Sequence, residues 1–153
     1  MKKKLCIIAV TAAFVFAFFS WFHVSGKEIR YVKDISADCT VTVTVFGKTP
    51  TTGIGTGGWK ERETYTLTAG QTEELKQLLL STTFRRNPAD TILWESDKDK
   101  MRYDIFVDFG DGQRTISVHG AGNHHLSISG QFSDHFLMIR NDNWEETLCG
   151  ILA

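Results

Sequence analysis

The stretch RYDIFVDFGDGQRTISVH, residues 102–119, decides the fold because it encodes two strands and the turn between them. Its central Asp-Gly dipeptide is favoured in two-residue type I′ hairpin turns. Pairing across such a turn places Val107 opposite Ile116. It also places Ile105 opposite Val118, so the apolar residues of both strands share one face. The stretch therefore predicts a half-buried antiparallel hairpin with these four side chains at the centre of the core.

The other face of this hairpin is polar and holds the candidate site residues. The same register sets Asp104 across from His119. A three-residue loop at residues 120–122 is predicted to lead into a further strand at residues 123–129. That strand would bring His125 to the polar face, one diagonal from His119. Two imidazoles and a carboxylate suit zinc or copper, although a solvated polar face is the more common outcome for such residues.

The chain begins with three lysines, Lys2 to Lys4, followed by an almost unbroken apolar run from Leu5 to Val24. A helix of about 20 such residues is long enough to cross the ~30 Å hydrocarbon core of a bilayer. The lysines would stay on the cytoplasmic side, and Trp21 lies where an interfacial aromatic anchor is expected. The run therefore predicts a transmembrane helix in the cell membrane, single-pass, with the C-terminal domain outside.

A secretory signal peptide is the alternative, because it has the same charged start. Its apolar region is usually about 7 to 15 residues long and ends in a small-residue cleavage site. The run in this chain is longer, but Val24-Ser25-Gly26 has the character of such a site. We therefore expect residues 1–26 to be an uncleaved anchor or a signal peptide, and in the second case the protein is secreted after cleavage at Gly26.

The rest of the chain is long enough for one domain with its own core. We assign residues 27–38 to a charged juxtamembrane segment and residues 39–153 to a single extracytoplasmic domain. Removing the 3 N-terminal lysines from 17 basic residues leaves 14, against 18 acidic residues. A mildly acidic domain lacks the basic surface that nucleic-acid binding requires, so no nucleic-acid partner is expected.

Local patterns predict the remaining elements. Thr68 and Gln71 fit a capping box that begins a helix, and Leu75, Leu78 and Leu79 give that helix an apolar stripe. The other expected elements are strands at residues 39–46, 61–67 and 135–140, a short strand at 91–94, a glycine-rich loop at 47–59, and a final helix capped by residues 142–145. This order predicts a two-layer α+β fold, with a mostly antiparallel sheet and one or two helices packed on one face.

Two cysteines, Cys39 and Cys149, lie outside the apolar run. A disulfide between them would close a loop of about 100 residues and stabilise the fold by up to ~4.7 kcal/mol in the chain-entropy model. The alternative is two separate buried thiols that act as small apolar residues. The sequence leaves both alternatives open.

No catalytic motif accompanies these elements. The chain has no Gly-x-Ser-x-Gly nucleophile elbow, and its glycine-rich stretch at residues 53–60 lacks the spacing of a phosphate-binding loop. We therefore expect no enzyme and no cofactor. The predicted function is a small binding or interaction module of the immunity, sensor or envelope-associated type, with a membrane contact through the N-terminal helix and a protein partner at the cell envelope. The alternative is a metal-binding protein or metal-dependent enzyme that uses Asp104, His119 and His125.

Overall fold

The computed structural model describes residues 2–48, 59–86, 101–122, 125–130, 136–138 and 143–153. In chain order the elements are α1 (Lys2–Phe22), β1 (His23–Ser25), the 3-10 helix η1 (Gly26–Glu28), α2 (Arg30–Lys33), β2 (Thr40–Lys48), β3 (Trp59–Thr66), α3 (Ala69–Ser81), β4 (Thr83–Arg86), β5 (Arg102–Asp108), β6 (Thr115–Ala121), β7 (His125–Gly130), β8 (Phe136–Met138) and α4 (Trp144–Leu152).

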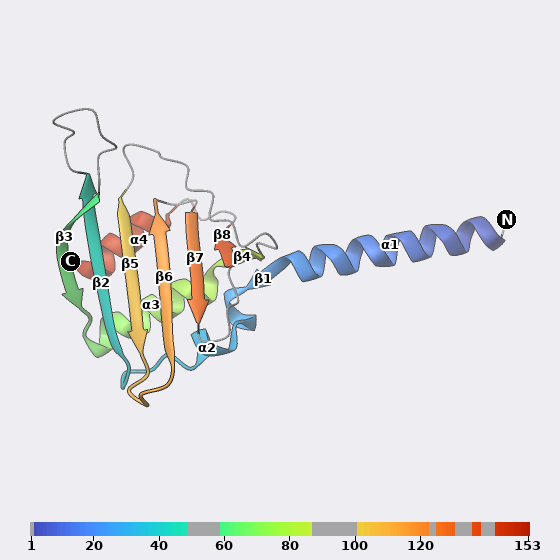
Figure 1. Cartoon of the computed structure of the whole chain (residues 1–153). Helices are drawn as coiled ribbons and strands as arrows, with labels where there is room; N and C mark the ends of the chain where they lie inside the picture. Colours follow the sequence, from blue (N-terminus) through green and yellow to red (C-terminus); the bar gives the residue numbers. More distant parts are fainter. Residues whose placement is uncertain (1, 49–58, 87–100, 123–124, 131–135, 139–142) are drawn as a thin grey trace.

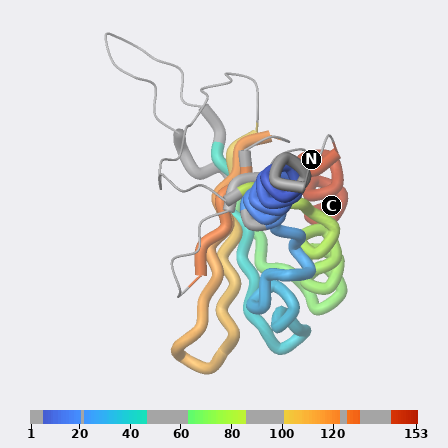
Figure 2. Tube along the Cα trace, turned by 90° about the vertical axis from the view of Figure 1, so that its right-hand side faces the viewer, coloured from blue at the N-terminus to red at the C-terminus, as the bar shows by residue number. Residues whose placement is uncertain are grey.

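The described strands form one sheet in the order β1-β4-β8-β7-β6-β5-β2-β3, in which the neighbouring strands pair antiparallel. Helices α3 and α4 lie on the same face of this sheet, as Figure 1 and the edge-on view in Figure 2 show. The described residues place no helix on the opposite face. The predicted α+β fold with an antiparallel sheet is therefore confirmed.

The register of the β5–β6 hairpin is the predicted one. Val107 pairs with Ile116, and Ile105 pairs with Val118. These four side chains are at most 1% exposed. Because every second residue of both strands is buried against α3 and α4, the hairpin forms the centre of the core, as its periodicity predicted.

The connection between β5 and β6 is longer than the predicted two-residue turn. Pairing stops at Asp108, and residues 109–114 form a loop in which Gly110 and Gly112 have positive φ angles of 72° and 71°. The Asp111 carboxylate accepts the backbone N–H groups of Gln113 and Arg114. Aspartate side chains commonly stabilise turns in this way, so the loop is held by side-chain hydrogen bonds.

The predicted loop at residues 120–122 is wrong, because β6 continues through Ala121. Gly120 pairs with Leu126 and Ala121 pairs with His125, and Gly122, directly after β6, has a φ of 57°. A Cβ atom on Gly120 would overlap the ring of Tyr103 on the neighbouring strand β5. Gly120 therefore makes room for an aromatic ring within the sheet. The register differs from the predicted one by an even number of residues, so Leu126 still lies on the buried face, where it is 0% exposed.

Helix α3 begins where the sequence predicts. The Thr68 hydroxyl accepts the Gln71 N–H, and the Gln71 side chain accepts the Thr68 N–H, which completes the capping box. The same Gln71 side chain donates to the Ile151 carbonyl of α4 at 2.6 Å, which joins the two helices. The buried apolar side chains of the two helices are Leu75, Leu78 and Leu79 on α3 and Trp144, Leu148 and Ile151 on α4.

Two segments differ from the sequence interpretation. Residues 27–38 contain η1 and α2, and their apolar side chains Ile29, Val32 and Ile35 are buried in the core. Strand β4 directly follows α3 and was not predicted, whereas the short strand expected at residues 91–94 lies outside the described residues. The domain core thus begins before residue 39.

The cysteines do not form the disulfide that the sequence left open, because Cys39 and Cys149 are free thiols. Cys39 is buried, and its sulfur accepts the Ser36 N–H at 3.4 Å. Cys149 is exposed on α4, and its sulfur lies 3.9 Å from the Met101 sulfur. Separate thiols are therefore confirmed, but Cys149 is not buried as that alternative proposed.

Helix α1 projects away from the domain and continues directly into β1 (Figure 1). Its apolar side chains are exposed along most of its length; they include Ile7, Ile8, Val10, Phe14, Val15, Phe16, Phe18 and Phe19. Within the described residues, no helix combines the length and apolar character needed to cross a membrane. The predicted transmembrane helix is therefore not confirmed.

Candidate functional site

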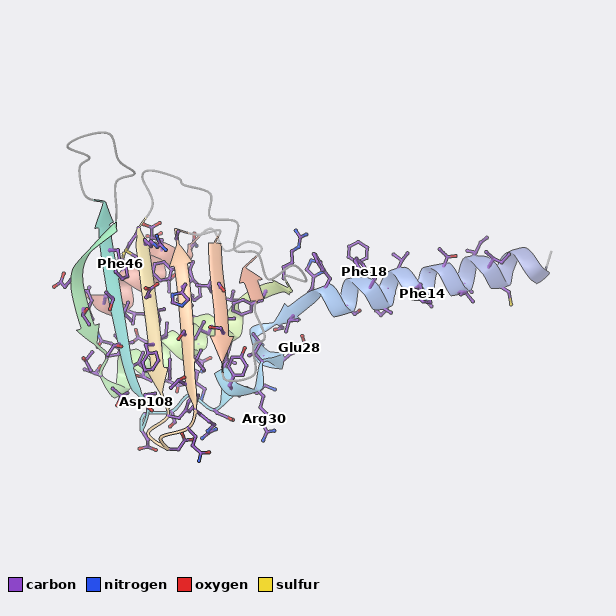
Figure 3. All side chains as sticks on the ribbon, in the orientation of Figure 1. Phe14, Phe18, Glu28, Arg30, Phe46 and Asp108 are labelled. Atoms are coloured by element: carbon purple, nitrogen blue, oxygen red, sulfur yellow. The ribbon has the colours of Figure 1, made fainter. Side chains whose placement is uncertain are left out.

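The face of the sheet opposite α3 and α4 is the candidate site, and we call its central part the open face. The registers of β2, β5 and β6 place alternate residues of these strands on it. Its side chains are exposed or half-buried, in contrast to those that point toward the helices. The open face comprises Thr40, Thr42, Thr44 and Phe46 of β2, Arg102, Asp104, Phe106 and Asp108 of β5, and Thr115, Ser117, His119 and Ala121 of β6. Phe46 and Asp108 mark its two ends in Figure 3.

Phe106 lies at the centre of the open face and is 44% exposed. Among the described residues outside α1, it is the exposed large hydrophobic side chain. Its cross-strand partners are Thr42 and Ser117, and Asp104 and Asp108 lie two residues away on its own strand. An aromatic side chain surrounded by polar groups resembles the energetic centre of a protein interface.

Asp104 and His119 form a direct pair on this face, as the sequence predicts. His119 Nδ1 lies 2.7 Å from Asp104 Oδ1, and the two side chains are 42% and 39% exposed. The hydrogen bond to Asp104 raises the pKa of His119, while partial burial opposes that rise. The nearby Arg102 charge also lowers the pKa of His119. The net effect favours the imidazolium form, which strengthens the pair.

The third candidate metal ligand, His125, is only partly described. Its backbone pairs with Ala121, which places it on the open-face side of β7 and one diagonal from His119. The sequence register instead placed it near Ser117. The side chain of His125 lies outside the described residues, as do His124 and His135. Among the described side chains, no three His, Cys, Asp or Glu residues are close enough to bind a metal ion, so the metal site stays a prediction.

Sequence reasoning missed Phe106 as a candidate binding residue. The alternation in residues 102–108 assigns it to the polar face, where an aromatic residue is the exception to the pattern. This exception to the pattern was the signal in the sequence that could have identified Phe106 as a candidate binding residue. Its exposure depends on which face the helices cover, and this is a property of the tertiary structure.

Comparisons with protein-family models, curated proteins and solved structures find no match for this chain.

Proposed function

We propose that this chain is a small binding module outside the cell membrane, attached to the membrane by its N-terminal helix, with the open face as its binding surface. The observation that carries the proposal is Phe106, a 44% exposed aromatic side chain at the centre of a polar sheet face. The neighbouring residues of β5, Ile105 and Val107, are buried in the core. An exposed aromatic side chain adds no stability to the core, whereas a partner that covers it would gain binding free energy from burying its apolar surface.

The membrane attachment is supported by the chemistry of the N-terminal segment. Lysines precede the apolar run, and the large apolar side chains of α1 that include Phe14, Phe16 and Phe18 are exposed, as expected of a helix that meets lipid. A reporter that is active only in the cytoplasm, fused after Ala153, should be inactive. Activity of that fusion would exclude an external domain.

Of the two processing alternatives, we propose the uncleaved anchor. Strand β1 pairs with β4, and its Val24 is 7% exposed within the core. Gly26 is also built into the fold, because its N–H donates to Thr82 and an added Cβ would overlap the Leu79 carbonyl oxygen. Cleavage after Gly26 would remove all of these contacts. The mass of the exported protein tests this proposal, since cleavage would shorten the chain by residues 1–26.

The open face fits a protein partner. Thr42 and Ser117 offer hydroxyl groups on both sides of Phe106, and Asp104 with His119 adds a charged pair beside it. An apolar centre with a polar rim that forms hydrogen bonds is the usual anatomy of a protein interface. We propose binding at this face and no catalytic step.

Affinity capture from intact membranes tests the binding proposal. Full-length wild type is compared with Phe106→Ser and with Glu74→Ser, a matched change at an exposed position of α3 on the helix-covered side. Phe106→Ser should lose a captured partner that wild type and Glu74→Ser retain. Equal capture by all three chains would contradict the proposed surface.

Metal binding is the second candidate, favoured by the 2.7 Å contact between Asp104 and His119. These two residues would supply a carboxylate oxygen and an imidazole nitrogen, which zinc accepts. His125 would have to provide a further ligand.

A further inference from the structure

The side of the domain next to α1 carries exposed cations. Lys27 in η1 and Arg30 at the start of α2 are both exposed. Arg85 of β4 is exposed too, and its guanidinium carbon lies 4.2 Å from the centre of the Phe22 ring at the end of α1. Figure 3 shows Arg30 and Glu28 at the end of the domain from which α1 projects. We call Lys27, Arg30 and Arg85 the basic rim.

Glu28 is a carboxylate that lies between Lys27 and Arg30 in the chain. Glu28 Oε2 accepts the Ser25 N–H at 2.9 Å, and this bond forms part of the capping box of η1. The three cations of the basic rim outnumber this one carboxylate, so the group of four residues has a net positive charge.

The N-terminal half of α3 carries carboxylates away from the basic rim. The C-terminal end of α3 adjoins η1, because the Gly26 N–H donates to the Thr82 carbonyl at 2.8 Å. The N-terminal half of this 13-residue helix, which is about 20 Å long, therefore points away from α1. It carries the exposed Glu73 and Glu74.

No linker separates α1 from the domain, so the domain cannot turn freely relative to this helix. Helix α1 ends at Phe22, and β1 begins at His23. Arg85 contacts both sides of this junction, since its backbone pairs with His23 and its side chain stacks on Phe22. A membrane that holds α1 therefore also fixes the height of the basic rim above its surface.

We propose that the basic rim binds the phosphates of anionic lipid headgroups and so holds the domain against the membrane. This inference rests on the proposed attachment by α1. Arginine and lysine are the side chains that bind phosphate oxygens. Each cation near an anionic membrane surface strengthens binding by about fivefold, so the three together supply roughly a hundredfold preference for anionic over neutral lipid.

Vesicle sedimentation tests this inference with the full chain. Wild-type protein is diluted from detergent into vesicles of phosphatidylcholine alone or with about 30% phosphatidylglycerol at low salt, where such attraction is strongest. Lys27→Gln with Arg30→Gln should reduce the preference for anionic vesicles by roughly 25-fold and leave binding to neutral vesicles unchanged. Arg85→Gln is tested separately because it also removes the contact with Phe22. Lys76→Gln on α3 is the matched control and should keep the wild-type preference.

The results distinguish lipid binding by the basic rim from membrane attachment by α1, on which it rests. Absence of wild-type binding to both kinds of vesicle would refute attachment by α1. Binding to both kinds, with the same anionic preference in wild type and in the Lys27→Gln, Arg30→Gln chain, would overturn the basic rim alone. A loss of preference in Lys76→Gln that equals the loss in the double variant would also overturn it, because the effect would then follow net charge.

Discussion

Replacing Gly120 with alanine should destabilise the domain, because the added methyl group has no room in the sheet. Gly120 pairs with Tyr103, whose ring is 0% exposed, and the new Cβ would overlap that ring. Adding atoms to a packed site costs about 1–3 kcal/mol. We expect the upper end of this range, about 3 kcal/mol, because the Tyr103 ring is buried and cannot move outward to relieve the overlap. At about 2–4 °C per kcal/mol for a domain of this size, the melting temperature should fall by roughly 6–12 °C.

Urea denaturation of full-length variants measures this loss, and two further changes identify its cause. Gly70→Ala is the matched control on α3, where an added Cβ meets nothing within 4 Å. It should be neutral or stabilise the protein by up to about 1 kcal/mol. In a Tyr103→Leu background, Gly120→Ala should cost less than about 1 kcal/mol, which gives a coupling energy of about 2 kcal/mol. Additive losses in the double variant would refute the overlap as the cause.

Three further predictions follow from the core and the Asp104–His119 pair. Ile116→Ala should cost about 2–5 kcal/mol in urea denaturation because Ile116 is 0% exposed; a loss below about 0.5 kcal/mol would be typical of a surface residue. The pKa of His119 is raised above 6.5 in the folded state, so its stabilisation is present below that pH and is lost as the pH rises through the folded pKa. Since both side chains are more than a third exposed, we expect the pair to stabilise the fold by at most about 1 kcal/mol. Asp104→Asn should remove this change of stability with pH, measured from about pH 5 to about pH 8.5. Zinc at 100 times the dissociation constant of a real site would add about 2.7 kcal/mol; we expect no shift in melting temperature, and a shift that disappears in both His119→Ala and His125→Ala would favour the metal-binding alternative.

The parts of the fold that the sequence predicts correctly depend on short-range patterns. The β5–β6 register follows from two alternating strands, because a slip of β5 by one residue would turn Ile105 and Val107 away from the core. The start of α3 follows from Thr68 and Gln71, which lie within one helical turn and satisfy each other's backbone donors. In both cases the interacting residues are close in the sequence.

The errors come from contacts that are distant in the sequence. Gly120 has the local character of a turn residue, but it is required because Tyr103 lies across from it on another strand. Strand β4 forms because β1 and β8 provide partners on both of its sides. The pairing of β1 with β4 joins residue 24 to Phe84, and no local pattern indicates such a contact.

The features of the candidate site that the sequence predicts also depend on local contacts, and those that it misses depend on distant ones. The Asp104–His119 pair was predictable because it depends on the hairpin register alone. The importance of Phe106 was not predictable, because its exposure depends on α3 and α4 covering the opposite face. The position of His125 was shifted along β7 by the same error that misplaced the loop after Gly120.

Photo-crosslinking from position 106 in intact membranes tests the central claim most directly. A photoreactive phenylalanine analogue at Phe106 keeps the aromatic ring at the centre of the open face, and the same analogue at Glu74 reports on the helix-covered side. We predict a discrete adduct from position 106 that is absent from position 74 and is lost when the neighbouring Ser117 is replaced with arginine. No adduct from position 106, or the same adducts from both positions, would contradict the assignment of the open face as the binding surface.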